Sequence, residues 1–193
     1  MCPSKMYMKR TCLVVSDFGW EGRFWKIVVY IFSIYTILEC SSPLALLANL
    51  PDSSLTASNS GNDSIFHSRL HSVAGVGGWL SDSSTDQWIQ ANFMNEYHVS
   101  IVATQGRGQG DLEHWVTEYT LMYGYHELAL LPVSDGSGNV AHFSGNYDKQ
   151  EVVRNTFPPV RAKVVRLVPT TWEEMAVLRW EVYGCIAGIL LHL

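Results

Sequence analysis

Serine, histidine and aspartate are frequent in this chain, but their spacing matches no nucleophilic or phosphate-binding motif. A G-x-S-x-G elbow would expose a serine nucleophile, an H-E-x-x-H helix would hold a catalytic zinc ion, and a P-loop would bind phosphates. None of these patterns occurs in the 193 residues. The sequence therefore predicts a protein that is not an enzyme and that uses no cofactor.

Two stretches have a partial metal-ligand pattern. His67 and His71 are four residues apart, a spacing that would place both rings on one face of a helix. The surrounding residues 58–78 are rich in Ser, Gly and Asn and show no helical period, which predicts a long exposed loop instead. The stretch "DGSGN" at 135–139 is similar to the start of a calcium loop, but Val140 occupies the position that requires glycine, so a turn is the better interpretation. We therefore predict no metal site.

Charge is distributed unevenly along the chain. The formal net charge is −5; residues 40–185 hold 8 basic and 15 acidic residues, a net of −7, and residues 1–39 hold 5 and 3, a net of +2. Binding to phosphate groups requires cationic side chains, so nucleic acid is an unlikely partner for such an acidic body. The same charge weakens electrostatic attraction to anionic lipid.

The first 39 residues are typical of a targeting segment. Five basic residues accompany a short apolar run at 27–38, "IVVYIFSIYTIL". A membrane-spanning helix needs about 20 apolar residues, whereas a signal peptide needs about 7–15. We expect residues 1–39 to be a signal peptide, with an uncleaved signal anchor as the alternative. The apolar tail at 186–193 is too short to span a bilayer.

Alternating apolar and polar residues from Trp79 onward predict a series of strands. The pattern occurs in the runs 89–93, 99–103, 115–123 and 176–183, separated by glycine-rich connections such as 105–114. Pro169 is expected to end a strand, and "FPPV" at 157–160 is expected to form a rigid corner. Hydrophobic residues make up 47% of the chain, enough for a core, in which we place most of the tryptophans. Arg166, Arg179 and Glu181 are expected to form ion pairs on a sheet face.

Several short motifs, in order, carry a family resemblance. The chain resembles a discoidin domain, also called the coagulation factor V/VIII type C domain, over Cys40 to Cys185. The matching motifs are "CSSPL" (40–44), "WIQANF" (88–93), "VATQGR" (102–107), "WVTEYTLMYG" (115–124), "FSGN" (143–146), Asp148, Pro158-Pro159, "RLVPTTW" (166–172) and "LRWEVYGC" (178–185). The family usually has glycine where Met94 stands and aspartate where Asn92 stands.

The resemblance implies an all-β domain at 40–185. Its fold would be an antiparallel β-sandwich or jelly roll, discoidin-like and galactose-binding-like. It also implies a disulfide between Cys40 and Cys185, which would place the domain in an oxidising compartment. Closing a loop of ~145 residues has a chain-entropy ceiling of about 5 kcal/mol. From the residues alone, two separate buried thiols remain the alternative.

In discoidin domains, long loops at one end of the sandwich, called spikes, carry recognition. The matching residues here are 59–71 for the first spike and 106–114 for the second. The candidate binding residues are Ile65, Phe66 and His67 in the first, Arg107, Asp111, Leu112 and His114 in the second, and Trp79 and Asp82 near the loop that matches a polar pocket between the spikes of some relatives. Ile65 and Phe66 could instead fold back onto the domain. Asn62 lies in a glycosylation sequon within the first spike.

These features predict a binding module that is secreted or held on the extracellular face of the plasma membrane. The first expectation for its ligand is an extracellular protein or glycan, which gives an adhesion module. The alternative is a phosphatidylserine membrane surface, contacted through Ile65, Phe66 and Leu112. A third hypothesis is an accessory domain that directs an enzyme to a glycan.

Overall fold

The computed structural model describes residues 40, 42–58, 65–81 and 85–187, together with 11–12 and 30–31. The chain divides into two units, Met1–Glu39 and Cys40–Leu193. In the first, strands β1 (Thr11–Cys12) and β2 (Tyr30–Ile31) pair antiparallel. Most of the apolar run at 27–38 and most of the tail at 186–193 fall outside the described residues, so the predictions made for them stay predictions. Within the described ranges, no helix is long and apolar enough to cross a membrane.

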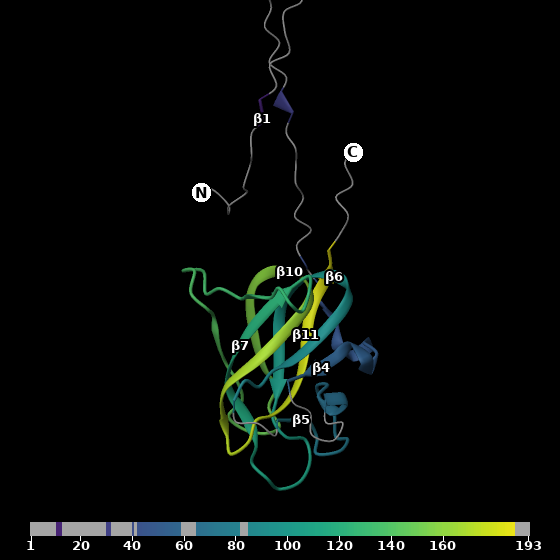
Figure 1. Cartoon of the computed structure of the whole chain (residues 1–193), viewed down its shortest axis with the longest axis vertical. Helices are drawn as coiled ribbons and strands as arrows, with labels where there is room; N and C mark the ends of the chain where they lie inside the picture. The colour runs from purple at the N-terminus through teal and green to yellow at the C-terminus, as the bar shows by residue number, and fades with distance from the viewer. Residues whose placement is uncertain are drawn as a thin grey trace, which may run out of the picture. The chain divides into compact units, whose positions relative to one another are not determined.

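The second unit is built from antiparallel strands, which confirms the all-β prediction (Figure 1). The main strand order is β3-β11-β6-β10-β7-β8, with β4 beside β6, β5 beside β11 and β9 beside β7. The bounds are β3 Leu44–Ala45, β4 Leu55–Ala57, β5 Trp79–Leu80, β6 Ile89–Gln105, β7 Trp115–Gly124, β8 Leu131–Pro132, β9 His142–Ser144, β10 Val153–Glu173 and β11 Val177–Ile186. Short 3₁₀ turns, η1 (Leu47–Asn49) and η2 (Asp52–Ser54), connect β3 to β4.

Two long strands, β6 and β10, run through both layers of the sandwich. The sequence pattern predicted two separate strands at 89–93 and 99–103, and the structure joins them into β6. The first residues of β6 pair with the second half of β10, and its later residues pair with the first half. The register slips between Thr156 and Val160 and again between Ala162 and Val164. Such irregularities bend a strand, and bent strands pass from one sheet to the other.

The prolines of β10 have different effects from those predicted. The predicted corner at "FPPV" is instead a register slip within a continuous strand, because Pro158 and Pro159 lie between Thr156 and Val160 of β10. The prediction that a strand ends at Pro169 is wrong, because β10 continues to Glu173. Pro169 lies opposite Tyr119, next to a further register shift. At a bulge, the missing proline N–H removes no regular ladder bond, so the strand continues.

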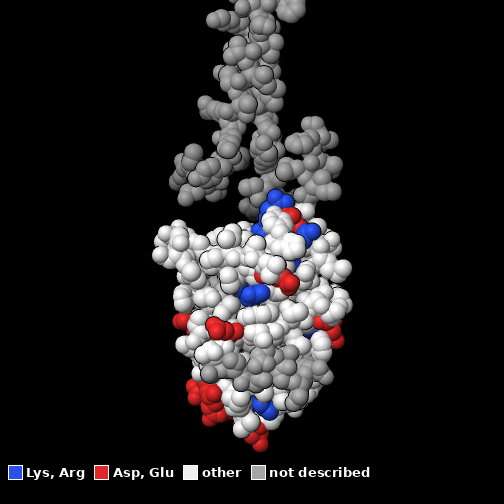
Figure 2. Space-filling model, viewed as in Figure 1, with Lys and Arg blue, Asp and Glu red and all other residues white. Residues whose placement is uncertain are grey.

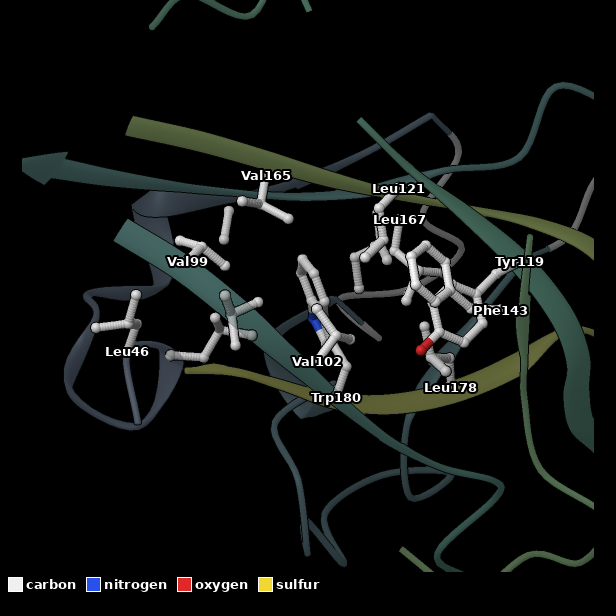
Figure 3. Packing of buried hydrophobic residues seen from close by; sticks show 14 of the residues in the cluster. Leu46, Val99, Val102, Tyr119, Leu121, Phe143, Val165, Leu167, Leu178 and Trp180 are labelled. Atoms are coloured by element: carbon white, nitrogen blue, oxygen red, sulfur yellow. The ribbon is translucent and has the colours of Figure 1, made fainter. Parts of the chain in front are cut away.

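The hydrophobic core lies between the two layers (Figure 3). Trp180 from β11, Tyr119 and Leu121 from β7 and Leu167 from β10 are fully buried there. The predicted core position of Trp180 is confirmed, whereas Trp88, Trp115 and Trp172 are partly exposed. Burial of large aromatic and aliphatic side chains supplies most of the free energy that stabilises such a sandwich.

Arg166 does not form the ion pair that we expected. Its guanidinium stacks 4.1 Å from the centre of the Trp88 ring. Nε and Nη2 both donate to Gln90 Oε1, at 3.0 and 2.7 Å. The charge is therefore held by a ring face and an amide on the outside of the sheet.

A disulfide joins Cys40 to Cys185, as the resemblance implied. Their Cα atoms are 5.6 Å apart, although 145 positions separate them in sequence. The pairing of β3 with β11, in which Leu44 lies opposite Gly184, brings the two ends of the domain together. Two of the four cysteines are therefore bridged and not separate buried thiols.

Met94 occupies a bulge position that favours glycine, and this generates a stability prediction. Its φ is +62°, its N–H donates to Asn92 Oδ1 at 3.0 Å, and 68% of its surface is exposed. A left-handed backbone conformation is strained for any residue that has a Cβ. Because the Met94 side chain is largely exposed, removing it loses few packing contacts. Met94→Gly should raise the free energy of unfolding in urea by about 0.5–1 kcal/mol. Met94→Ala keeps the Cβ and should bring no gain; an equal gain from both would contradict the argument.

Candidate ligand-binding site at the loop end

The strand register brings several connections to one end of the domain, the lower end in Figure 1. Gln105 lies opposite Arg179, Thr104 opposite Val153, and Trp115 opposite Glu173. The connections next to these residues, 106–114, 145–152 and 173–176, therefore lie at the same end of the domain. We call this surface the loop end and define it as residues 65–81, 106–114, 145–152 and 173–176.

Arg179 is the residue that ties these loops together. It is 2% exposed and lies on the outer face of β11, away from the core. Nε donates to the Gly106 carbonyl at 2.7 Å, Nη2 to the Lys149 carbonyl at 2.7 Å, and Nη1 to the Ser72 carbonyl at 3.3 Å. One guanidinium thus bonds to three different loops. Burial lowers the pKa of Arg179 from its usual value. The three carbonyl dipoles stabilise the positive charge of the guanidinium. The predicted ion pair is therefore wrong for this residue.

The first and second loops also touch backbone to backbone. The N–H of Gly108 donates to the carbonyl of Gly77 at 2.6 Å. A Cβ on Gly108 would lie 2.5 Å from the carbonyl oxygen of Ser72, and a Cβ on Gly77 would lie 2.5 Å from the Cα of Gly108. The glycines that mark these connections as loops in the sequence are therefore needed for close approach.

The second loop, 106–114, is held by its own side chains. His114 is buried, with Nδ1 3.5 Å from Nη1 of Arg107 and Nε2 3.1 Å from Oε2 of Glu174. Nζ of Lys149 lies 2.9 Å from Oε1 of Glu113 and donates to the carbonyl of Gly110. Of the four residues predicted here, Arg107 and His114 thus make contacts within the loops.

The other two residues predicted in this loop face solvent. Asp111 is exposed, and Leu112 has 51% of its surface exposed. Within the described part of the chain, neither side chain forms a hydrogen bond or an ion pair, and both lie in the middle of the loop. They are therefore the members of the predicted second spike that are available to a ligand.

The first loop separates its two bulky apolar residues. Residues 65–67 form a 3₁₀ turn, so neighbouring side chains point in different directions. Ile65 is 5% exposed and packs in the core, whereas Phe66 is 38% exposed. The alternative that Ile65 folds back onto the domain is thus confirmed, and the prediction that its side chain contacts a ligand is wrong. His67 is partly exposed, with its ring against Gly75.

The remaining predicted residues take no described part in the site. Trp79 belongs to β5, lies opposite Leu178 and is fully buried, so the expectation that it contacts a ligand directly is wrong. Asp82 and the sequon residue Asn62 lie outside the described residues and stay predictions. Among the described residues, no group of three or more His, Cys, Asp or Glu side chains could hold a metal ion.

Three exposed apolar residues of the loop end were missed in the sequence. Val73 is 63% exposed, Tyr147 72% and Met175 39%. Each is an isolated bulky residue in a polar connection, which is a weak signal in a chain with many hydrophobic residues. With Phe66 and Leu112 they give five exposed apolar side chains on four connected loops.

The role of Arg179 can be tested by substitution. Arg179→Met should leave three loop carbonyls without donors and lower the free energy of unfolding by about 3 kcal/mol. Hydrogen exchange at the Gly108 amide should become faster, because the loops lose their common partner. Arg154→Met is the matched control: Arg154 is exposed over the ring of Tyr183, and we expect a loss below about 1 kcal/mol. Equal losses in the two variants would contradict this role.

Comparison with known proteins identifies the fold family. The model of the F5/8 type C domain matches residues 53–182. Hemocytin of Bombyx mori is 30% identical over 149 residues, which cover 77% of this chain and 4% of hemocytin. Human retinoschisin is 32% identical over 122 residues, which cover 62% of this chain and 54% of retinoschisin. The chain thus matches about half of retinoschisin and a small part of hemocytin.

Solved structures agree with this assignment. The discoidin II structure of Dictyostelium discoideum superposes with a TM-score of 0.65 at 27% identity, covering 76% of this chain and 60% of that protein. The family 32 carbohydrate-binding module of NanJ from C. perfringens, solved with galactose, gives 0.51 at 14% identity and 74% and 98% coverage, a likeness of fold alone. On the matched domain, the strand order and the bridged termini, this chain belongs to the F5/8 type C domain family.

Proposed function

We propose that this protein is a non-catalytic extracellular binding module that recognises a protein or glycan through its loop end. Domains of this family are carbohydrate- or protein-binding modules. The single observation that carries the proposal is the group of exposed apolar side chains on loops that Arg179 ties together. Variable loops on a rigid scaffold are the usual place for recognition.

The energetics of the loop end support this use. Phe66, Val73, Leu112, Tyr147 and Met175 expose between 38% and 72% of their surfaces. A ligand that covers them gains about 25 cal/mol for each Å² of apolar surface removed from water. Because the loops are already bonded to one another, little ordering entropy opposes binding.

The disulfide supports an extracellular location. Bridges such as Cys40–Cys185 persist in oxidising compartments and are rare in the cytosol. We therefore place the protein among secreted proteins or on the outer face of the plasma membrane. The net charge of −7 over residues 40–185 opposes the phosphate binding that a nucleic acid partner would require.

Phosphatidylserine is the second candidate ligand, favoured by the exposed Phe66 and Leu112 on two neighbouring loops. Ile65, the third residue of that hypothesis, is buried, and the acidic residues around Leu112 oppose an anionic surface. We expect weak co-sedimentation with phosphatidylserine vesicles, with no change beyond about twofold in Phe66→Asp. Strong binding that Phe66→Asp abolishes would favour the membrane instead.

The proposed function is tested on arrays of glycans and extracellular matrix proteins. The full chain should bind at least one class, and Leu112→Ser with Tyr147→Ser should weaken that binding by about tenfold or more, because both side chains are exposed at the loop end. The matched control is Leu128→Ser with Leu131→Ser, which removes two exposed leucines, 92% and 62% accessible, from the β7–β8 connection and β8. No binding to either class, or equal loss in both variants, would contradict the proposal.

A further inference from the structure

Several polar side chains near the loop end are buried without a partner. Ser68 and Asn146 belong to that surface, and Thr104 and Trp180 lie at its base on β6 and β11, away from the charged groups that Figure 2 shows on one face of the domain. Each of the four is at most 2% exposed. In the ranges that the structure describes, Oγ of Ser68, Oγ1 of Thr104, Oδ1 of Asn146 and Nε1 of Trp180 form no hydrogen bond with a protein group. Native proteins pair almost every buried polar atom, with protein or with ordered water, because an unpaired one is costly.

Thr104 and Trp180 point into the interior from neighbouring strands. They lie directly opposite each other in the β6–β11 ladder, one step before the outward-facing pair of Gln105 and Arg179. Because side chains alternate along a strand, both face the core, where Figure 3 shows the Trp180 ring among apolar side chains. Opposite side chains in such a ladder have Cβ atoms about 4.5–5.5 Å apart, a gap that two hydrogen bonds of about 2.8 Å through one oxygen atom can span.

Asn146 brings the 145–152 loop to the same place. Its Nδ2 donates to the carbonyl of Thr104 at 3.3 Å and to the carbonyl of Glu151 at 2.8 Å. Its Oδ1 is bonded to the same carbon atom as Nδ2, so this unpaired oxygen also lies close to Thr104. Unpaired atoms from β6, β11 and the loop are therefore held near one another on the inner side of the sheet.

The chemistry of these three side chains indicates what they bind. Nε1 of Trp180 only donates, Oδ1 of Asn146 only accepts, and the hydroxyl of Thr104 does both. A metal ion needs a lone pair from each of its ligands, and an indole N–H offers none. A water molecule both donates and accepts, and buried waters typically make about three hydrogen bonds to groups of this kind. The set of donors and acceptors therefore matches water.

We propose that the domain binds one ordered water molecule between Trp180, Thr104 and Asn146. The water accepts from Nε1 of Trp180, donates to Oδ1 of Asn146 and shares a hydrogen bond with Oγ1 of Thr104. It satisfies three buried atoms for which the polypeptide supplies no partner among the described residues. The site lies inside the domain and does not depend on which ligand the loop end takes.

The water holds the 145–152 loop from the inner side of the sheet, whereas Arg179 holds it from the outer side. Arg179 donates to the carbonyl of Lys149 at 2.7 Å. Asn146, three residues earlier in the same loop, is bonded to the water on the inner side. The exposed Tyr147 lies between these two fixed points, so its backbone is already ordered when the side chain meets a ligand.

Cross-relaxation between water and the protein, measured by NMR on the isotope-labelled full chain, tests the site. The Hε1 proton of Trp180 should give peaks at the water frequency with opposite signs in the laboratory and rotating frames, as a bound water does. The hydroxyl of Thr104 can relay such a signal by exchanging its own proton with bulk water. Thr104→Val removes that relay and leaves the other two partners of the water, so the peak should persist. A peak that is missing from the wild type, or lost in Thr104→Val, overturns the proposal.

Amide hydrogen exchange tests whether the water couples the loop to the strands. The N–H of Asn146 donates to the carbonyl of Val116 at 2.8 Å, so its exchange reports opening of the 145–152 loop. Thr104→Val keeps the shape of the side chain but removes one partner of the water, and should speed this exchange about fivefold or more. Thr104→Ser keeps the hydroxyl and should change the exchange rate less than about twofold. Equal acceleration in the two variants would show that packing alone holds the loop, and would overturn the proposed bridge.

Discussion

The arrangement of the ligand surface depends on one buried guanidinium. Arg179 lies on the outer face of β11 and donates to carbonyls of three loops that are far apart in sequence. Carbonyl oxygens accept from a cation more strongly than from a neutral donor, and the site is closed to water. The loops therefore have a common fixed point at the strand, and their tips can differ without loss of the sandwich.

Glu181, two residues along β11, plays the corresponding role for the segment after β3. Its carboxylate accepts from the backbone N–H of Leu47 at 2.6 Å, of Ala48 at 3.1 Å and of Val182 at 2.9 Å. Burial raises the pKa of Glu181, and the N–H groups partly offset this rise. The pKa of this carboxyl is therefore higher in the folded state than in the unfolded state. As pH rises from the unfolded-state pKa through the folded-state pKa, the free energy of unfolding falls. The outer face of β11 thus uses charge to order irregular backbone.

The scaffold and the ligand surface follow different physical rules. The core is filled by apolar side chains such as Trp180 and Leu167, and a change there costs stability. The loop end has exposed apolar side chains and close glycine contacts, and a change at its tips should alter binding instead. This separation lets one fold present different ligand surfaces.

Local sequence patterns determined the features of this protein that depend on the alternation of apolar and polar residues and on the positions of glycine residues. Alternation predicted the strands, the short motifs indicated the family and its disulfide, and the glycine-rich stretches marked the loops. The tertiary structure decided which of these side chains are buried and which groups they bond to. Pairing of β5 with β11 buried Trp79, a 3₁₀ turn sent Ile65 inward and Phe66 outward, and loop packing over β11 changed Arg179 from an expected ion-pair residue into a donor to three carbonyls. The reason is that burial and bonding partners depend on segments tens of residues away, which alternation along one strand cannot specify.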